Sequence, residues 1–237
     1  FNSFATYSGG KTDFLGFDDG TRSLPGTIND TRVVRGNYSD QEMQDIGLSF
    51  KNNWHTQGTT APINGNIKIT LGDKYDLGED LLGYIASFDY SSSTTISDRQ
   101  KNFYDFSGAR YLYSGVGNIN TSMLSGLLNF SYKFNGTNKI SFKNIYNQNS
   151  DDETVIYKGD YRYADQYRDI TSLRFVSRSL SSHQLVGEHF FNLMNGFSWD
   201  YGLSYSRSLR DEPDARRYVY SRALDRPEDP LVFQLDQ

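Results

Sequence analysis

The segment Phe197–Arg210, "FSWDYGLSYSRSLR", decides the fold class because its side chains change character at every second position. Its odd positions carry large apolar side chains: Phe197, Trp199, Tyr201, Leu203 and Tyr205. Its even positions, which begin with Ser198 and Asp200, are small or polar. Successive side chains of a β-strand point to opposite faces of the sheet. We therefore interpret this segment as a strand with one aromatic face and one polar face.

Other parts of the chain repeat this alternation. It is clear over 66–71, 82–91 and 124–134, and weaker over 139–147 and 169–191. In the clear segments the apolar positions include Tyr84, Phe88, Phe130 and Tyr132, and the opposite positions include Asp89, Asn129 and Lys133. With a first strand over about 1–7, the pattern predicts about seven strands and an eighth that begins near Tyr218.

The composition favours a polar β-protein that meets a membrane. Aromatic residues make up 15% of the 237 residues, although the mean hydropathy is only −0.65. Aromatic side chains are typical anchors at a membrane–water interface. The absence of cysteine excludes disulfides and cysteine-based metal sites, and the net charge of −5 argues against a nucleic acid as partner.

The connections between the predicted strands alternate in length. Short connections are expected at 76–80, 135–138 and 193–196. Long polar connections are expected at about 10–63, 95–120, 148–168 and from 210 onward. Outer-membrane β-barrels have this order, with short periplasmic turns and long extracellular loops.

A membrane barrel is favoured over a soluble antiparallel sandwich, which would also alternate. No apolar run approaches the roughly 18 residues of a transmembrane helix. Lipid offers no partner to a free backbone N–H or C=O group, so a sheet that spans a membrane must close on itself. The clear segments match the roughly 9–11 residues of a spanning strand, and their polar faces suit a wet interior better than a packed soluble core.

Three stretches of sequence resemble TonB-dependent outer-membrane receptors. The stretch "GGKTDFLGFDDGTRSLP" (9–25) is similar to a segment that follows the plug domain in many of these receptors. The stretches "LGYIASFDYSSS" (82–93) and "LLNFSYKFNGTNKISFKNIYNQNSDDE" (127–153) are similar to the barrel strands that come next. The resemblance covers about residues 1–165. It implies a 22-stranded barrel filled by an N-terminal plug, whose TonB box couples transport to the inner membrane.

The resemblance implies that residues 1–237 form one partial β-barrel domain in the bacterial outer membrane, with seven or eight of the receptor's strands. The implied function is TonB-dependent uptake of a scarce nutrient, such as a siderophore, cobalamin, an oligosaccharide or a peptide, with signal transduction as a variant. The implied partners are membrane lipid, a plug domain that this chain lacks, the TonB system and a surface lipoprotein. Two alternatives stay open: a small complete barrel that acts as adhesin, anchor or hydrolase, and a soluble β-sandwich binding module.

The candidate substrate contacts lie in the expected loops. Asp18, Asp19 and Arg22 are candidates in the first long loop, although a salt-bridged turn that only folds the loop is the favoured interpretation. Asp151 and Asp152 are candidates within "NQNSDDE" (147–153), where a solvated loop tip is favoured over a Ca²⁺ site. Ser39, with Glu42 three residues later, predicts a short capped helix over 39–47.

The alternating faces are expected to meet different surroundings. The apolar set is expected to face lipid: Tyr84, Phe88, Phe130, Tyr132, Phe197, Trp199, Tyr201 and Tyr205. The polar set is expected to face the barrel interior: Asp89, Asn129, Lys133, Ser198 and Asp200. No catalytic site, metal site or cofactor is predicted. His183 and His189, for example, are separated by about 20 Å along one strand.

Overall fold

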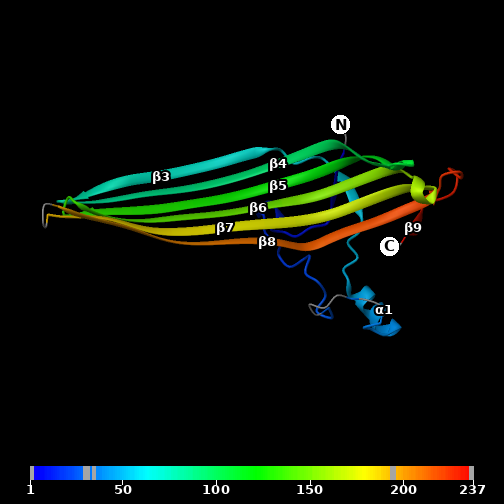
Figure 1. The fold of residues 1–237 in the computed structure, drawn as a ribbon, viewed down its shortest axis with the longest axis horizontal. Coiled ribbons are helices and arrows are strands. Elements are labelled where there is room, and N and C mark those ends of the chain that lie inside the picture. The colour runs from blue at the N-terminus through cyan, green and yellow to red at the C-terminus, as the bar shows by residue number, and fades with distance from the viewer. Residues whose placement is uncertain (1–2, 29–32, 34–35, 193–195, 235–237) are drawn as a thin grey trace.

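One antiparallel sheet makes up most of the molecule and forms a long array of side-by-side strands (Figure 1). The computed structural model describes residues 3–28, 33, 36–192 and 196–234. The sheet holds seven strands in sequence order: β3 (Gly65–Leu77), β4 (Asp80–Asp105), β5 (Gly108–Phe134), β6 (Asn138–Tyr161), β7 (Gln166–Phe191), β8 (Phe197–Ala223) and β9 (Val232–Gln234). The predicted all-β antiparallel fold is confirmed. Among the described residues the sheet stays open, with β3 at one edge.

The strands are much longer than the sequence indicated. Each of the five strands from β4 to β8 has 24 to 27 residues. The regions 95–120 and 148–168, expected as long loops, lie within these strands apart from short links near 106–107 and 162–165. The region from 210 likewise continues β8. Polar side chains occur on both faces in these regions and the alternation is lost, and such a pattern does not distinguish a strand from a loop.

The central strands keep one register over their full length. Pairing of β5 with β6 runs without a shift from the Tyr111–Tyr161 pair to the Phe134–Asn138 pair. Pairing of β6 with β7 is equally continuous. We call residues that lie opposite one another across the strands a rung. Because alternation is unbroken, the members of one rung share a face of the sheet.

A bulge at Glu212 and Pro213 interrupts β8. Phe175 and Ser177 of β7 pair on either side of the bulge, so the two β8 residues together oppose only Val176. Proline donates no backbone hydrogen bond, and within sheets it occurs at bulges and edges. The extra residue reverses the face on which the following side chains lie. The predicted eighth strand is thus the continuation of β8 beyond the bulge.

Short turns join the strands at one end of the sheet, as predicted. Gly78 and Glu79 link β3 to β4, and residues 135–137 link β5 to β6. Asn135 and Gly136 have φ angles of +49° and +66°, in the left-handed region that suits these residue types in hairpin turns. The third expected turn, at 193–196, includes 193–195, which lie outside the described residues.

The N-terminal segment contributes no strand to the large sheet. Its elements are β1 (Phe4–Tyr7), the 3-10 turn η1 (Asp13–Leu15), α1 (Asp40–Ser49) and β2 (Thr56–Thr59). The first predicted strand does not join the large sheet, because β1 pairs with β2. The predicted helix is confirmed: the Ser39 hydroxyl accepts a hydrogen bond from the Glu42 N–H group, and the Glu42 carboxylate accepts one from the Ser39 N–H group.

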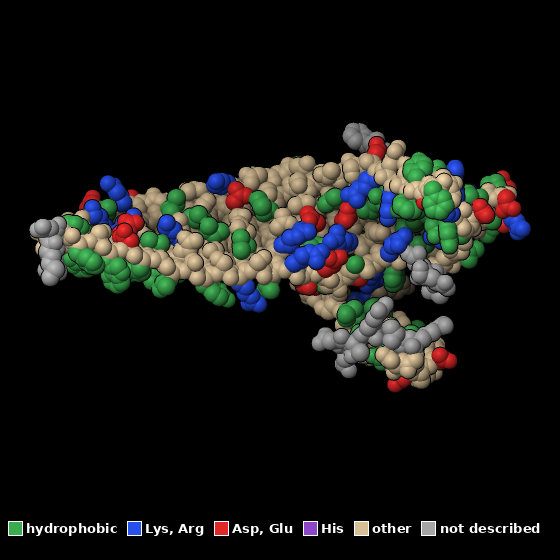
Figure 2. Space-filling view, viewed as in Figure 1, with side chains coloured by type: hydrophobic (Ala, Val, Ile, Leu, Met, Phe, Trp, Pro, Cys, Tyr) green, Lys and Arg blue, Asp and Glu red, His purple; other side chains and the backbone are tan. Residues whose placement is uncertain are grey.

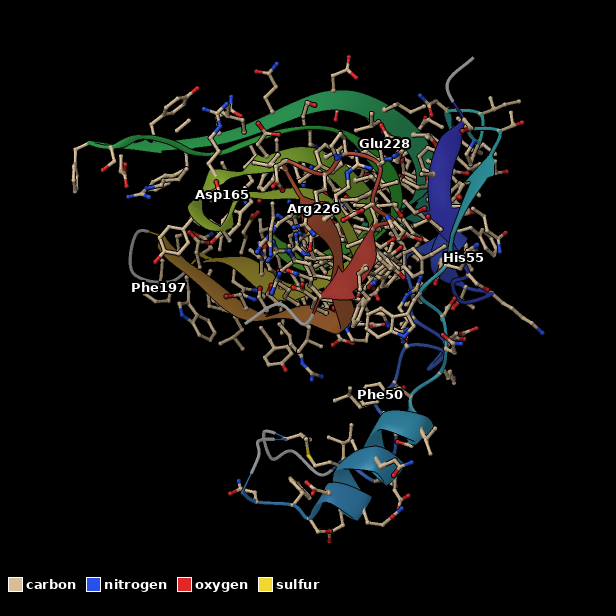
Figure 3. The ribbon with its side chains drawn as sticks, turned by 90° about the vertical axis from the view of Figure 1, so that its right-hand side faces the viewer. Phe50, His55, Asp165, Phe197, Arg226 and Glu228 are labelled. Atoms are coloured by element: carbon tan, nitrogen blue, oxygen red, sulfur yellow. The ribbon has the colours of Figure 1, made fainter. Side chains whose placement is uncertain are left out.

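Figure 3 looks along the strands and shows α1 set apart from the sheet, with Phe50 at its C-terminal end. The label for His55 marks the chain where it returns toward β2. Among the described residues, no helix is long and apolar enough to span a membrane.

Replacing Gly136 tests the β5–β6 turn. We expect Gly136→Val to destabilise the protein by about 1–3 kcal/mol, because a β-branched residue is strained in the left-handed region. Gly65→Val is the matched control, because Gly65 begins β3 without a positive φ and has open space around it. The urea midpoints of both variants measure the effect. Equal midpoints would contradict the turn conformation described here.

Candidate functional site

The two faces of the large sheet differ in character, and we name each after one residue. The register places one predicted set on the Tyr84 face: Tyr84, Phe88, Phe130, Tyr132, Phe197, Trp199, Tyr201 and Tyr205. It places the other set on the Asp89 face: Asp89, Asn129, Lys133, Ser198 and Asp200. The two sets thus lie on opposite faces. Their contact with lipid or with a barrel interior stays a prediction.

An apolar band occupies the Tyr84 face next to the short turns. It covers six rungs, from the rung of Leu77 to the rung of Ile67. Ten positions separate Ile67 from Leu77 on β3, which corresponds to roughly 33 Å along the strand. At the usual tilt of barrel strands this length is about 25 Å in height. The band is open to its surroundings, since Leu203 is 66% exposed and Trp199 is 53% exposed.

Aromatic rings gather toward the two ends of this band. Near the short turns, Tyr75 stacks with Tyr84 at 6.2 Å between ring centres, and His189 lies 5.9 Å from Trp199. Toward the far end the rings are those of Phe88, Tyr146 and Tyr90. Leu71 and Leu128 lie in a rung between the two groups, together with Tyr205, and Leu185 and Leu203 share the rung of Tyr84.

Polar side chains interrupt the band at a few positions. Asn144 Oδ1 and His183 Nδ1 hydrogen bond to each other at 2.7 Å. Gln148, Ser179 and Ser181 lie in the two rungs farthest from the short turns. The charged residues of the six rungs are Asp73 on β3, Arg207 on β8 and Asp80 at the turn between β3 and β4. Apart from Asp80, the band positions of β4 and β5 present a continuous apolar and aromatic surface.

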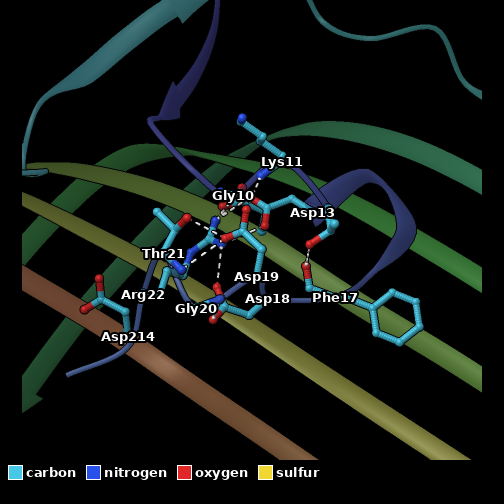
Figure 4. A network of polar contacts seen from close by, with 12 residues as sticks. Gly10, Lys11, Asp13, Phe17, Asp18, Asp19, Gly20, Thr21, Arg22 and Asp214 are labelled. Atoms are coloured by element: carbon cyan, nitrogen blue, oxygen red, sulfur yellow. Dashed lines mark hydrogen bonds and ion pairs between the residues drawn. The ribbon is translucent and has the colours of Figure 1, made fainter.

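The N-terminal segment binds the same Tyr84 face farther along the strands, and Arg22 anchors it (Figure 4). The Arg22 guanidinium donates two hydrogen bonds to the Asp13 carboxylate, at 2.7 and 2.6 Å, and lies 3.3 Å from Asp18. It lies 3.6 Å from Asp152 of β6 and 4.1 Å from the centre of the Phe175 ring of β7. Only 2% of its side chain is exposed. Arg22 is thus a structural anchor without a surface open to ligand.

Asp19 orders the turn beside this anchor. Its carboxylate accepts hydrogen bonds from the Thr21 side chain and from the Thr21 and Lys11 N–H groups. The Thr21 hydroxyl contributes most to lowering the pKa of Asp19 to about 2. Asp18 accepts a hydrogen bond from the Gly20 N–H group at 2.9 Å. The three candidate substrate contacts in this loop therefore form a salt-bridged turn, the favoured interpretation, with Asp18 and Asp19 binding within the segment and Arg22 also contacting the sheet.

Three further hydrogen bonds fasten the segment to the sheet. The Ala5 N–H group donates to Asn118 at 3.2 Å, the Gln148 side chain donates to the Gly16 carbonyl at 2.6 Å, and the Tyr90 hydroxyl donates to the Phe14 carbonyl at 2.8 Å. Gly16 has a φ of +86° and lies directly over β6, where a Cβ atom would be 3.2 Å from Gln148 Cγ. The Gly-rich composition of this segment thus serves close backbone approach to the strands.

Asp151 and Asp152 do not form a loop tip, contrary to the sequence-based expectation. Both lie in the middle of β6, so their side chains point to opposite faces. Asp152 lies beneath Arg22 on the Tyr84 face. Asp151 lies on the Asp89 face, where it binds Arg178 at 2.7 Å and Thr121 at 2.9 Å. Adjacent acids within a polar run gave no sign of a strand.

A ladder of ion pairs crosses the Asp89 face, and sequence analysis missed it. Glu153 of β6 lies 2.9 Å from Arg99 of β4 and 3.8 Å from Arg174 of β7. Arg174 also binds Glu212 of β8 at 2.8 Å, and Glu212 binds Arg210 at 2.5 Å. Figure 2 shows such blue and red side chains gathered over the middle of the sheet. The partners are far apart in sequence, so only the register reveals the ladder.

Gly117 allows the first ion pair to span β5. A Cβ atom at this position would overlap the Arg99 guanidinium, which lies flat across the strand. Beside the ladder is a cavity of about 340 Å³, whose lining includes Asp151, Glu153 and Arg174. Among the described residues, no group of three or more His, Cys, Asp or Glu side chains is arranged to hold a metal ion. The ladder is therefore a polar contact surface with both signs of charge.

The anchor contains more carboxylates than its single cation satisfies. Arg22 is bound in bidentate fashion by Asp13 and more distantly by Asp152. Burial raises the pKa of Asp152 to about 7, with repulsion from Asp13 adding to the effect and Arg22 opposing it. Asp152 lies two rungs beyond the apolar band, in the part of β6 that the N-terminal segment covers.

We expect docking of the N-terminal segment to weaken as the pH rises from about 4 to 7. An undocked, solvated Asp152 titrates near 4, whereas the docked form holds its proton up to about 7. The docked form therefore binds more protons in this window, and raising the pH favours release until the dependence levels off above 7. Amide hydrogen exchange over residues 4–28, measured from pH 5 to 8, checks this. Asp152→Asn should flatten the profile, and an unchanged profile would contradict the assignment.

Replacing Arg22 tests whether this cation holds the N-terminal segment on the sheet. We expect Arg22→Met to release residues 4–28, because loss of one partner from a buried ion cluster costs about 3–5 kcal/mol. Protease sensitivity of the segment should rise while far-UV circular dichroism of the sheet stays unchanged. Lys11→Met is the control, because its side chain is exposed. Equal protease sensitivity of the two variants would show that Arg22 is not the anchor.

No protein-family model matches the chain, and no curated protein is similar to it.

Proposed function

We propose that this chain forms part of the wall of an outer-membrane β-barrel, in a receptor that imports a scarce nutrient. The observation that carries the proposal is the apolar band on the Tyr84 face. Its height of about 25 Å and its flanking aromatic rings match the lipid-facing surface of transmembrane barrels. On this proposal the Tyr84 face is the outer face of the wall, and the Asp89 face lines the interior.

The exposure of the band supports lipid as its partner. Soluble monomers rarely expose contiguous apolar patches larger than a few hundred Å². In this sheet Ile67, Leu71, Phe130, Leu203 and Tyr205 are all more than 40% exposed, although they lie on three different strands. A soluble sandwich would cover these side chains with a second sheet. The described residues contain no second sheet over the band.

The opposite face supports a wet interior. Beside the band, the Asp89 face carries small and polar side chains: Ser87, Asn129, Ser131, Ser182, Ser204 and Ser206. The ion-pair ladder continues this polar surface farther along the strands. Such side chains suit contact with water, with a plug domain or with a passing solute.

The open edges favour a part of a larger barrel over a small complete one. Among the described residues, β3 pairs only with β4, and the part of β8 that carries the band pairs only with β7. Unpaired backbone groups are too costly in lipid. Closure therefore needs further strands. The sequence resemblance to TonB-dependent receptors supports energised import as the function of such a barrel, with lipid, plug, TonB system and surface lipoprotein as partners.

A charge on each face tests the orientation. We expect Leu128→Arg to disfavour folding into lipid vesicles by about 2–4 kcal/mol, because the Arg side chain would enter hydrocarbon. Leu127→Arg is the matched control, because Leu127 is the adjacent residue on the Asp89 face. The folded fraction, measured by gel mobility with and without heating across a urea series, reports the difference.

Two outcomes would overturn the proposal. Equal effects of the two substitutions would show that the band does not face lipid. A protein that refolds as a stable monomer in water without detergent would favour the soluble binding module. Uptake that continues in cells without a working TonB system would remove only the energised part of the proposal.

A further inference from the structure

An aromatic platform covers the Asp89 face at the end of the sheet farthest from the apolar band. It consists of four consecutive rungs, which begin on β4 at Ser97, Arg99, Lys101 and Phe103. Its rings are those of Phe103, Tyr111, Tyr113, Tyr157 and Tyr161. Tyr111 stacks with Tyr113 at 5.0 Å and with Phe103 at 5.7 Å between ring centres. Tyr113, Ile170 and Val219 form its buried base.

The charge on this platform has one sign. The four rungs carry four cations on the Asp89 face: Arg99, Lys101, Arg168 and Arg217. Within these four rungs, all of which the structure describes, no member is an Asp or a Glu. The interleaved rungs of the Tyr84 face instead carry Asp98, Asp160 and Asp169. The acids are thus separated from the cations by the thickness of the sheet.

The cations lie against the rings. The Arg168 guanidinium is 3.6 Å from the centre of the Tyr161 ring, and Lys101 Nζ is 5.9 Å from the centre of the Tyr111 ring. Arg99 also reaches down to Glu153 in the next rung. Arg168 and Lys101 are therefore positioned beside the rings, where a ligand that covers the rings would meet positive charge.

Glycines keep the platform flat. Gly115 and Gly117 of β5 lie in the rungs of Arg99 and Ser97, and Cβ atoms there would overlap Tyr157 and Arg99, respectively. These side chains consequently lie along the sheet. Six positions along β4 and five strands across give a surface of about 20 Å by 20 Å. Such an area fits several linked sugar rings and is larger than one aromatic acid.

We propose that this platform binds an acidic oligosaccharide, with sugar rings stacked on the tyrosines and carboxylates or sulfates beside the cations. The inference rests on the proposed function, which makes the Asp89 face the interior surface that a solute meets. Stacking on aromatic faces favours rings, and the cations Lys101 and Arg168 beside those rings favour anions over neutral sugars.

Binding in detergent micelles tests the platform without requiring membrane insertion. The probes are tetragalacturonate, neutral maltotetraose and 2,3-dihydroxybenzoate, each titrated by calorimetry at low and high salt. We expect tetragalacturonate to bind most tightly and to weaken with salt. We expect Lys101→Gln to weaken it at least threefold, and Lys101→Gln with Arg168→Gln at least tenfold. Lys158→Gln is the matched control, because Lys158 lies in neighbouring rungs on the Tyr84 face.

Each remaining outcome overturns the inference. These outcomes are absence of tetragalacturonate binding, tighter binding of dihydroxybenzoate, equal binding of maltotetraose, and an equal loss in Lys158→Gln. Lys101 is exposed, so its single substitution stays informative if the double variant does not fold. A protein that binds the acidic probe but does not enter vesicles would keep the platform and overturn the membrane assignment. The reverse result would overturn the platform alone.

Discussion

The pairing of β4 through β7, continuous apart from one register shift after Phe103 at the far end of β4, is the constraint on which the other features depend. Because no central strand gains or loses a residue along most of its length, every side chain keeps the face that its position in the alternation assigns. The apolar band, the ion-pair ladder and the aromatic platform follow from this register. A shift of one residue in any central strand would move hydrophobic rings to the polar side and charges to the apolar side.

The N-terminal segment depends on the same register in a different way. Arg22 contacts the Asp152 carboxylate of β6 and the Phe175 ring of β7. These two residues lie directly opposite each other in the β6–β7 pairing. Buried ion clusters contribute little net stability, because desolvation offsets the attraction. Their value lies in specificity, since only one placement of the segment satisfies Arg22. Because the carboxylates around Arg22 outnumber its single positive charge, the stability of that placement depends on pH.

Sequence analysis succeeded where one face had to be apolar. Alternation in Phe197–Arg210 identified a strand and the grouping of its side chains, and the Ser39–Glu42 pair identified the start of α1. It failed beyond the band, where polar and apolar side chains occur on both faces and the alternation is lost. Asp151 and Asp152 gave a loop-like signal although each has a well-defined partner. The Pro213 bulge hid the continuation of β8, because it reverses the alternation on which the prediction relied.

The great length of the strands has a consequence for how solutes approach. The strand β5 has 27 residues, of which a band of about 25 Å needs only roughly a third to a half. At an ordinary tilt the remaining residues would raise the rim of the wall some 40 Å above the hydrocarbon. On the proposed membrane placement, a large hydrated polymer would therefore contact the protein wall well before it reached the lipid headgroups. Which solutes pass that rim would then depend on the protein surface and not on the composition of the lipid below.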